Sequence, residues 1–208
     1  MTALDVADLS EEELHALADV TDDPDRHAAI QAALRSYYPW APQQQQLPPD
    51  EPFWTWVFQA GTGAGKSDVG SWWIDEHMRG PTCDPRWPGG HKGLLLAPTH
   101  ADAIASCVKD VSGILAHNRA VRLVGRKDGT FVVWPNGADA VVLGMHTEYD
   151  AERIRAQGHV CAWWVDEAAI GNHLIVAANL IRQRARLPKG KVARGIATTT
   201  PKPTAAYR

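Results

Sequence analysis

The chain has 208 residues, which is enough for one domain with an appendage. Its composition, 45% hydrophobic and 22% charged, lies near the average of globular proteins and excludes a disordered or low-complexity chain. No apolar run approaches the ~18 to 20 residues of a membrane span, and the amino terminus is acidic where a signal peptide would be basic and then apolar. We therefore expect neither membrane insertion nor secretion.

Charge is distributed unevenly along the chain. Residues 1–25 hold nine of the 24 acids and none of the 21 lysines and arginines, so the remainder is mildly basic. After Glu167 the chain carries eight lysines and arginines and no acid. This basic segment suits either a neighbouring phosphate backbone or a solvated helix end, and charge alone favours neither.

The first 38 residues predict a short, acidic helical arm. Ser10 is followed by three glutamates, the pattern of a capped helix start with acids in the first turn, and a second helix begins at Thr21–Pro24 and continues to about Tyr37. The arm either packs against the main domain or docks a partner. Residues 39–53 carry repeated prolines and the run Gln43–Gln46, so we expect a linker there.

Residues 54–208 alternate between strand and helix patterns. We expect strands at 54–59, 93–97, 121–124, 130–134, 140–143, 161–165 and 192–198, and helices at about 66–79, 101–117, 150–155 and 172–184. This alternation predicts an α/β domain with a mostly parallel sheet and helices on both faces. A ligand of such a sheet binds at the carboxyl ends of its strands.

A glycine-rich segment between the first strand and the first helix of this domain has the chemistry of a phosphate loop. Backbone N–H groups here would converge on phosphates at the helix amino terminus. Lys66 would reach the β and γ phosphates of ATP, and the Ser67 hydroxyl would ligate Mg²⁺. The usual pattern has glycine where this chain has Ala60, and the alternative is a flexible glycine turn beside a lysine. The loop residues expected to bind phosphate are Gly61, Thr62, Gly63, Ala64, Gly65, Lys66 and Ser67.

Two carboxylates end the apolar strand predicted at 161–165. Asp166 is suited to hold Mg²⁺ through its water shell, and Glu167 to orient and polarise the water that attacks the γ phosphate. Alone, the pair resembles an ordinary strand-to-helix turn. Together with the glycine-rich loop it favours an ATP-hydrolysing enzyme over a nucleotide kinase.

The cysteines and histidines follow no familiar ligand spacing. Cys83, Cys107 and Cys161 are widely separated and form no CxxC pair, so we expect neither a disulfide framework nor a zinc ribbon. The thiols are predicted to be buried or to have no chemical role, in a reducing compartment.

At this point several stretches, taken in order, resemble the ATPase domain of the large terminase of tailed bacteriophages. These stretches are Trp40–Pro42, Trp54–Trp56, Leu95–Thr99, Trp134–Gly137, Arg153–Arg155, Trp164–Ala168 and Thr199–Pro201. The resemblance implies a P-loop NTPase of the RecA/ASCE kind that uses ATP and Mg²⁺ to drive double-stranded DNA into a procapsid. It also implies a homo-oligomeric ring in the host cytoplasm, with the portal and the small terminase subunit as partners and no membrane.

The resemblance assigns further roles. Arg155, eleven positions before Asp166, resembles the arginine that completes a neighbouring subunit's active site, with Arg153 as second choice. Thr200 lies in the motif that senses the γ phosphate and passes the change to DNA-gripping parts. Gln46 is chosen from its glutamine run as the contact to adenine. Where the family often has arginine in the phosphate loop, this chain has Thr62.

Large terminases also carry a nuclease domain with clustered acids, and no acid follows Glu167 here. We therefore expect no nuclease activity from this chain, which would be an excised ATPase domain, half of a split terminase or a truncated reading frame. Two alternatives stay open. One is a helicase-like motor domain, and the other is a nucleotide-gated DNA-binding or assembly module without turnover of its own.

Overall fold

The structure is a computed structural model that describes residues 13, 17, 46–49, 53–170 and 173–201. The chain divides into two compact units, Met1–Ala41 and Pro42–Arg208. Only Glu13 and Leu17 of the first unit are described, and both are helical. The rest of the predicted arm and most of the linker lie outside the described residues.

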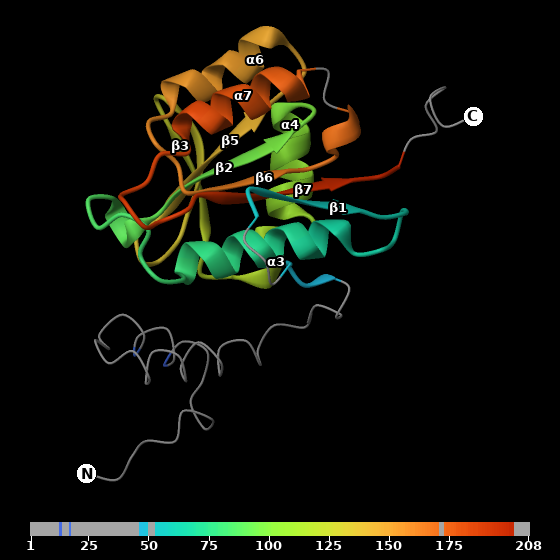
Figure 1. The fold of residues 1–208 in the computed structure, drawn as a ribbon. Coiled ribbons are helices and arrows are strands. Elements are labelled where there is room, and N and C mark those ends of the chain that lie inside the picture. Colours follow the sequence, from blue (N-terminus) through green and yellow to red (C-terminus); the bar gives the residue numbers. More distant parts are fainter. Residues whose placement is uncertain (1–12, 14–16, 18–45, 50–52, 171–172, 202–208) are drawn as a thin grey trace. The chain divides into compact units, whose positions relative to one another are not determined.

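The described part of the second unit is built on a seven-stranded sheet in the order β1-β7-β6-β2-β5-β4-β3 (Figure 1). Strands β1, β7, β6, β2 and β5 run parallel to one another, β4 runs antiparallel to β5, and β3 runs antiparallel to β4. The predicted mostly parallel α/β sheet is thereby confirmed. The β3–β4 and β4–β5 pairs are antiparallel because only short turns join these strands, whereas a parallel pair needs a crossover of a dozen or more residues. The strands are β1 Thr55–Gln59, β2 Lys92–Ala97, β3 Arg122–Arg126, β4 Gly129–Val133, β5 Asp139–Gly144, β6 Ala162–Val165 and β7 Arg194–Thr199.

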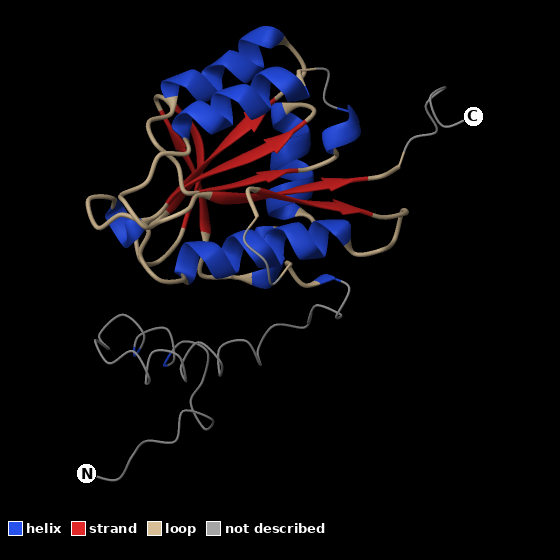
Figure 2. Cartoon of the chain, viewed as in Figure 1, coloured by secondary structure: helices blue, strands red, loops and turns tan. Residues whose placement is uncertain are grey.

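Helices cover both faces of the sheet, as predicted (Figure 2). On one face α3 (Lys66–Arg79) contacts the π-helical segment η4 (Ala103–Lys109) and α5 (Ile114–His117). On the other face lie α6 (Glu148–Glu152), the 3₁₀ turn η5 (Arg153–Ala156) and α7 (Leu174–Arg184). Because helices cover both faces, the central strands β2 and β6 are buried almost throughout, and a strand buried on both faces is a run of apolar residues. Short segments η3 (Pro88–Gly90), α4 (His100–Asp102) and η6 (Ala168–Ile170) complete the described helices, none of which is long and apolar enough to cross a membrane.

The prediction of a single helix at 101–117 is wrong. The chain instead forms α4, widens into η4 and restarts as α5. The Asp110 amide donates to the Ala105 carbonyl, a π-type bond that ends η4. Gly113 then passes so close to the preceding turn that a Cβ there would lie 2.7 Å from the Val108 carbonyl. The close approach, which only glycine permits, lets the chain turn before α5 begins.

Helix α3 is held firmly against the sheet. Gly70 lies directly on the Trp164 indole of β6, where a Cβ would come within 2.1 Å of the ring. Further along α3, the buried Asp75 carboxylate accepts hydrogen bonds from Trp134 Nε1 at 2.7 Å and from Asn118 Nδ2 at 2.9 Å. Its other oxygen accepts from Arg79 Nε at 2.9 Å. These contacts set the position of the helix that begins at Lys66.

Candidate nucleotide-binding site

Sheet order brings the predicted site residues together. Strand β7 lies between β1 and β6, so the loop after β1, the end of β7 and the acids after β6 meet at one edge of the sheet. The Ala60 amide donates to the Thr199 carbonyl at 3.2 Å, which continues the β1–β7 ladder into the start of the glycine-rich loop. The parallel order therefore places three segments distant in sequence at one edge of the sheet.

Two glycines of the loop before α3 adopt a backbone conformation that other residues rarely adopt. Gly63 (φ 81°) and Gly65 (φ 71°) adopt left-handed conformations that favour glycine, and Gly65 caps α3. Ala60 is absent from the positive-φ residues of the described chain, so the missing glycine at this position imposes no strain. Residues 61–64 are exposed, which leaves their backbone open to a ligand.

Lys66 is folded back over this loop. Its Nζ donates to the Gly61 carbonyl at 3.1 Å, and the residue is only 9% exposed. A lysine side chain beside an exposed loop at a helix amino terminus is an arrangement that suits an anion. Ser67 follows at the first turn of α3, half-buried, on the same end of the helix.

Gln46 contacts the loop from the segment before β1. Its side-chain amide donates to the Ala64 carbonyl at 3.1 Å, and the residue is buried. A Cβ at Gly65 would lie 2.9 Å from Gln46 Nε2, the end of a flexible side chain, so the positive φ of Gly65 rather than this contact favours glycine there. Gln46 thus contacts the glycine-rich loop, while its predicted contact with adenine stays a prediction.

Asp166 is buried at the end of β6, with 5% of its surface exposed. Its two carboxylate oxygens accept hydrogen bonds from the Thr198 hydroxyl at 2.8 Å and the Ser106 hydroxyl at 2.9 Å. Burial raises the pKa of Asp166, and these two hydrogen bonds oppose the shift. The carboxylate is therefore held in one orientation by groups from β7 and η4.

Sequence reasoning missed both hydroxyl partners. Thr198 lies one position before the Thr199–Pro201 motif, so its place at the end of an apolar strand was a usable signal. No sequence signal pointed to Ser106, because its approach to Asp166 depends on the π-helical turn that replaces the predicted regular helix.

Glu167 is joined to the end of β7. Its carboxylate accepts from the Thr200 amide at 3.2 Å and from the Thr200 hydroxyl at 2.9 Å. Glu167 is also the one described non-glycine residue with positive φ, at 45°, a conformation that costs on the order of 1–3 kcal/mol. Next to it, Thr199 Oγ1 accepts from the Ala169 amide at 3.0 Å. The acid pair and the threonine motif thus form one hydrogen-bonded unit.

Arg155 is not brought to this site by its own chain. Arg155 lies on η5, and its exposed guanidinium pairs with Glu152, the last residue of α6, at an N···O distance of 2.6 Å. The last residue of η5, Ala156, lines a pocket together with Lys92 and Asp139. Because Lys92 and Asp139 begin β2 and β5, η5 ends at the edge opposite the phosphate loop. Arg153, the second choice, has its guanidinium beside Gly129 at the start of β4.

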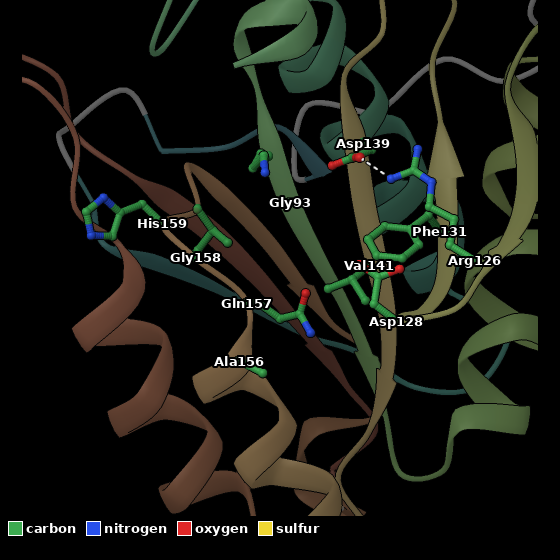
Figure 3. A pocket seen from close by; sticks show the side chains of 12 residues that line it. Gly93, Arg126, Asp128, Phe131, Asp139, Val141, Ala156, Gln157, Gly158 and His159 are labelled. Atoms are coloured by element: carbon green, nitrogen blue, oxygen red, sulfur yellow. Dashed lines mark hydrogen bonds and ion pairs between the residues drawn. The ribbon is translucent and has the colours of Figure 1, made fainter. Parts of the chain in front are cut away.

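The pocket beside η5 has a volume of about 190 Å³ and a polar lining (Figure 3). One wall carries the ion pair between Arg126 and Asp139, with an N···O distance of 2.7 Å, and Gln157 lines the other side. Its position at the amino ends of β2 and β5 separates it from the phosphate loop and the acid pair.

The fold is a mostly parallel α/β sheet with a phosphate-type loop and an acid pair at one edge. No family model and no curated protein matches the sequence. Among solved structures, the large terminase of a thermophilic bacteriophage aligns with a TM-score of 0.53 and 15% identity over 71% of this chain and 34% of that one. The large terminase ATPase domain of Thermus phage P74-26 aligns with a TM-score of 0.51 and 14% identity over 84% of this chain and 70% of that one.

These likenesses establish that the chain shares its fold with large terminase ATPase domains, as the sequence resemblance implied. The chain spans about a third of the length of the first of these two terminases.

Proposed function

We propose that this chain hydrolyses ATP as the motor domain of a terminase-like machine that drives double-stranded DNA into a procapsid. The observation that carries the proposal is the meeting of Lys66, Asp166 and Glu167 at one edge of a sheet with the terminase ATPase fold. The insertion of β7 between the phosphate-loop strand β1 and the acid-bearing strand β6 supports the RecA/ASCE class.

The residues at this edge suit Mg²⁺ and a nucleoside triphosphate. The loop N–H groups and Lys66 would bind the phosphates, with Ser67 and Asp166 as oxygen donors of the kind Mg²⁺ prefers. When bound, Mg²⁺ would neutralise charge on the phosphates. The Thr198 and Ser106 hydroxyls would keep the Asp166 carboxylate oriented toward this position.

Glu167 would act as the base that orients the attacking water. Its hydrogen bonds to Thr200 link this base to the end of β7, so a displacement of either residue would be felt by the other. This link supports the proposed role of Thr200 as the group that passes the state of the γ phosphate onward to the parts that grip DNA.

The proposed DNA, portal and small-subunit partners, and the host cytoplasm as location, follow from the terminase resemblance. The basic segment after Glu167 supports a polyanionic partner, since Arg182, Arg186, Lys189 and Lys191 are exposed. Arg155 is exposed and distant from its own phosphate loop, which supports a role in a neighbouring subunit's site within a ring.

Steady-state ATP hydrolysis, measured over a wide range of protein concentration with and without double-stranded DNA, tests the proposal. Glu167→Gln should lower kcat by about 10²-fold or more while Mg-ATP still binds, because a general base contributes ~10²–10⁴. Lys66→Ala should abolish nucleotide binding. Glu148→Gln, which alters an exposed acid on α6, is the matched control and should hydrolyse ATP like wild type. Equal hydrolysis by wild type and Glu167→Gln would refute the assignment of the base.

Mixing subunits tests the shared site. Arg155→Ala chains and Glu167→Gln chains, each inactive alone, should recover part of the hydrolysis when assembled together, because one keeps the base and the other the arginine. Absence of any recovery in assemblies verified by mass would exclude the trans role of Arg155.

A nucleotide-gated DNA-binding module is the second candidate. The observation in its favour is that the described chain brings no arginine finger to its own phosphate loop. This module would bind DNA in an ATP-dependent manner with no Glu167-dependent turnover at any protein concentration.

A further inference from the structure

Four side chains that could ligate a metal converge at the edge of the sheet opposite the phosphate loop. His77 lies in the last turn of α3, Cys83 in the loop that follows, His91 just before β2 and Cys161 just before β6. Their ligating nitrogen and sulfur atoms all lie within 4.8 Å of one another. His91 and Cys161 are almost fully buried, with 1% and 0% exposure, and Cys83 is 9% exposed.

The distances fit a tetrahedral metal site. His77 Nε2 lies 3.3 Å from Cys161 Sγ and 3.6 Å from Cys83 Sγ, and His91 Nδ1 lies 3.7 Å from Cys161 Sγ. With Zn–S bonds of about 2.3 Å and Zn–N bonds of about 2.0–2.1 Å, two ligand atoms of a tetrahedral zinc site are separated by about 3.6 Å. We propose that His77, Cys83, His91 and Cys161 bind Zn²⁺.

The surroundings of the cluster prepare its donor atoms. His91 Nε2 lies 3.1 Å from the Gly80 carbonyl, so this nitrogen carries the proton and Nδ1 is left as the donor for the metal. Cys161 Sγ accepts from the Lys92 amide at 3.4 Å, a contact open to a thiolate, and without a metal its thiol donates to the Lys92 carbonyl at 3.2 Å. The His77 ring is stacked on Trp73, which restricts its orientation. Ligands oriented by an outer shell in this way are typical of protein zinc sites.

The donor set indicates a structural role. Two thiolates and two imidazoles in a tetrahedral arrangement select zinc over Mg²⁺ or Ca²⁺, which take oxygen ligands. With four protein ligands the coordination shell is closed, so no position is open for a substrate. The metal would join the carboxyl end of α3 to the starts of β2 and β6, and would close the irregular segment between Gly80 and His91. Because α3 begins at Lys66, the site would anchor the far end of the helix that carries the phosphate-binding lysine.

The full chain, purified under reducing conditions without added chelator, provides the first test. We expect about one zinc per chain by elemental analysis, and an X-ray absorption spectrum that fits two sulfur neighbours at about 2.3 Å and two nitrogen neighbours at about 2.0–2.1 Å. Co²⁺ added after zinc removal should give the intense visible bands of a tetrahedral thiolate site. A wild-type chain that lacks zinc and binds neither ion, or a spectrum without sulfur neighbours, would overturn the proposal.

Variants separate the cluster from other thiols and imidazoles. Cys161→Ser and His91→Gln should reduce zinc to below about 0.1 per chain, since each removes a ligand from the closed site. Cys107→Ala and His159→Gln are the matched controls, because neither residue belongs to the cluster, and both should retain the wild-type zinc content. Equal zinc in ligand and control variants, or a Cys83–Cys161 disulfide found by mass spectrometry in the freshly purified reduced chain, would exclude the site. If a ligand variant fails to fold, the wild-type spectrum decides the question alone.

Discussion

Replacing Thr198 by valine should destabilise the chain by about 3 kcal/mol. The Thr198 side chain is fully buried and bridges two strands: its hydroxyl donates to Asp166 Oδ1 at 2.8 Å and accepts from Trp164 Nε1 at 2.9 Å. Valine has nearly the same shape, so the substitution removes the hydroxyl and little else. The effect therefore measures the two hydrogen bonds.

Each lost bond has its own cost. The Trp164 N–H, on a residue with 0% exposure, is left without this acceptor, at about 1–3 kcal/mol. The Asp166 carboxylate loses one of its two hydroxyl donors, and a hydrogen bond to a charged group contributes about 1.5–3 kcal/mol. Removing the buried hydroxyl also removes the cost of its desolvation, which stabilises the variant by about 1 kcal/mol. The balance is a loss of about 3 kcal/mol.

Urea unfolding at pH 7, followed by tryptophan fluorescence, measures this loss. With an m-value of about 2 kcal/mol/M the midpoint should fall by about 1.5 M. Thr130→Val on β4 is the matched control, because Thr130 is only half-buried and lies away from the acid pair. Its effect should stay within about 0.5 kcal/mol.

A destabilisation below about 1 kcal/mol by Thr198→Val would refute the reasoning. A second check uses Asp166→Asn as background, where the cost of Thr198→Val should shrink by about 1 kcal/mol or more. Additive costs would mean that the hydroxyl does not support the carboxylate.

Three further predictions concern the same framework. Gly70→Ala should lower the free energy of unfolding, because its Cβ would lie 2.1 Å from the Trp164 ring and overpacking costs about 1–3 kcal/mol against ~1 kcal/mol gained in helix propensity; a higher Tm would contradict this. Asp75→Ala should cost about 3 kcal/mol or more in urea unfolding, since it removes the acceptor of the buried Trp134 N–H, and a loss under about 1 kcal/mol would count against the network. Burial raises the pKa of Asp166, so its stabilising contribution is full below the unfolded pKa and is lost as pH rises through the folded pKa. Asp166→Asn should therefore gain stability relative to wild type from about pH 4 upward, and a difference that is constant with pH would disprove the shift.

Elements with local signals could be predicted from the amino-acid sequence alone. The helix predicted at 66–79 matches α3, Lys66–Arg79, because the glycine loop before it and Gly80 after it mark both ends. The apolar runs at 93–97 and 161–165 match β2 and β6 to within one residue, since strands buried on both faces carry no polar alternation. The glycine-rich loop and the acid pair could also be located, because each is a short motif within one strand-to-helix connection, and their roles stay predictions.

Which side chains meet depends on the three-dimensional packing. Ser106 reaches Asp166 from the π-helical segment η4, which replaces a regular helix there, and helix propensity does not predict that change. His91 and Cys161 are 70 positions apart, a spacing that matches no ligand motif. They become neighbours because each directly precedes one of the adjacent parallel strands β2 and β6. Strand adjacency depends on how all the helices cover the sheet, so contacts across it cannot be read from the residues on either strand.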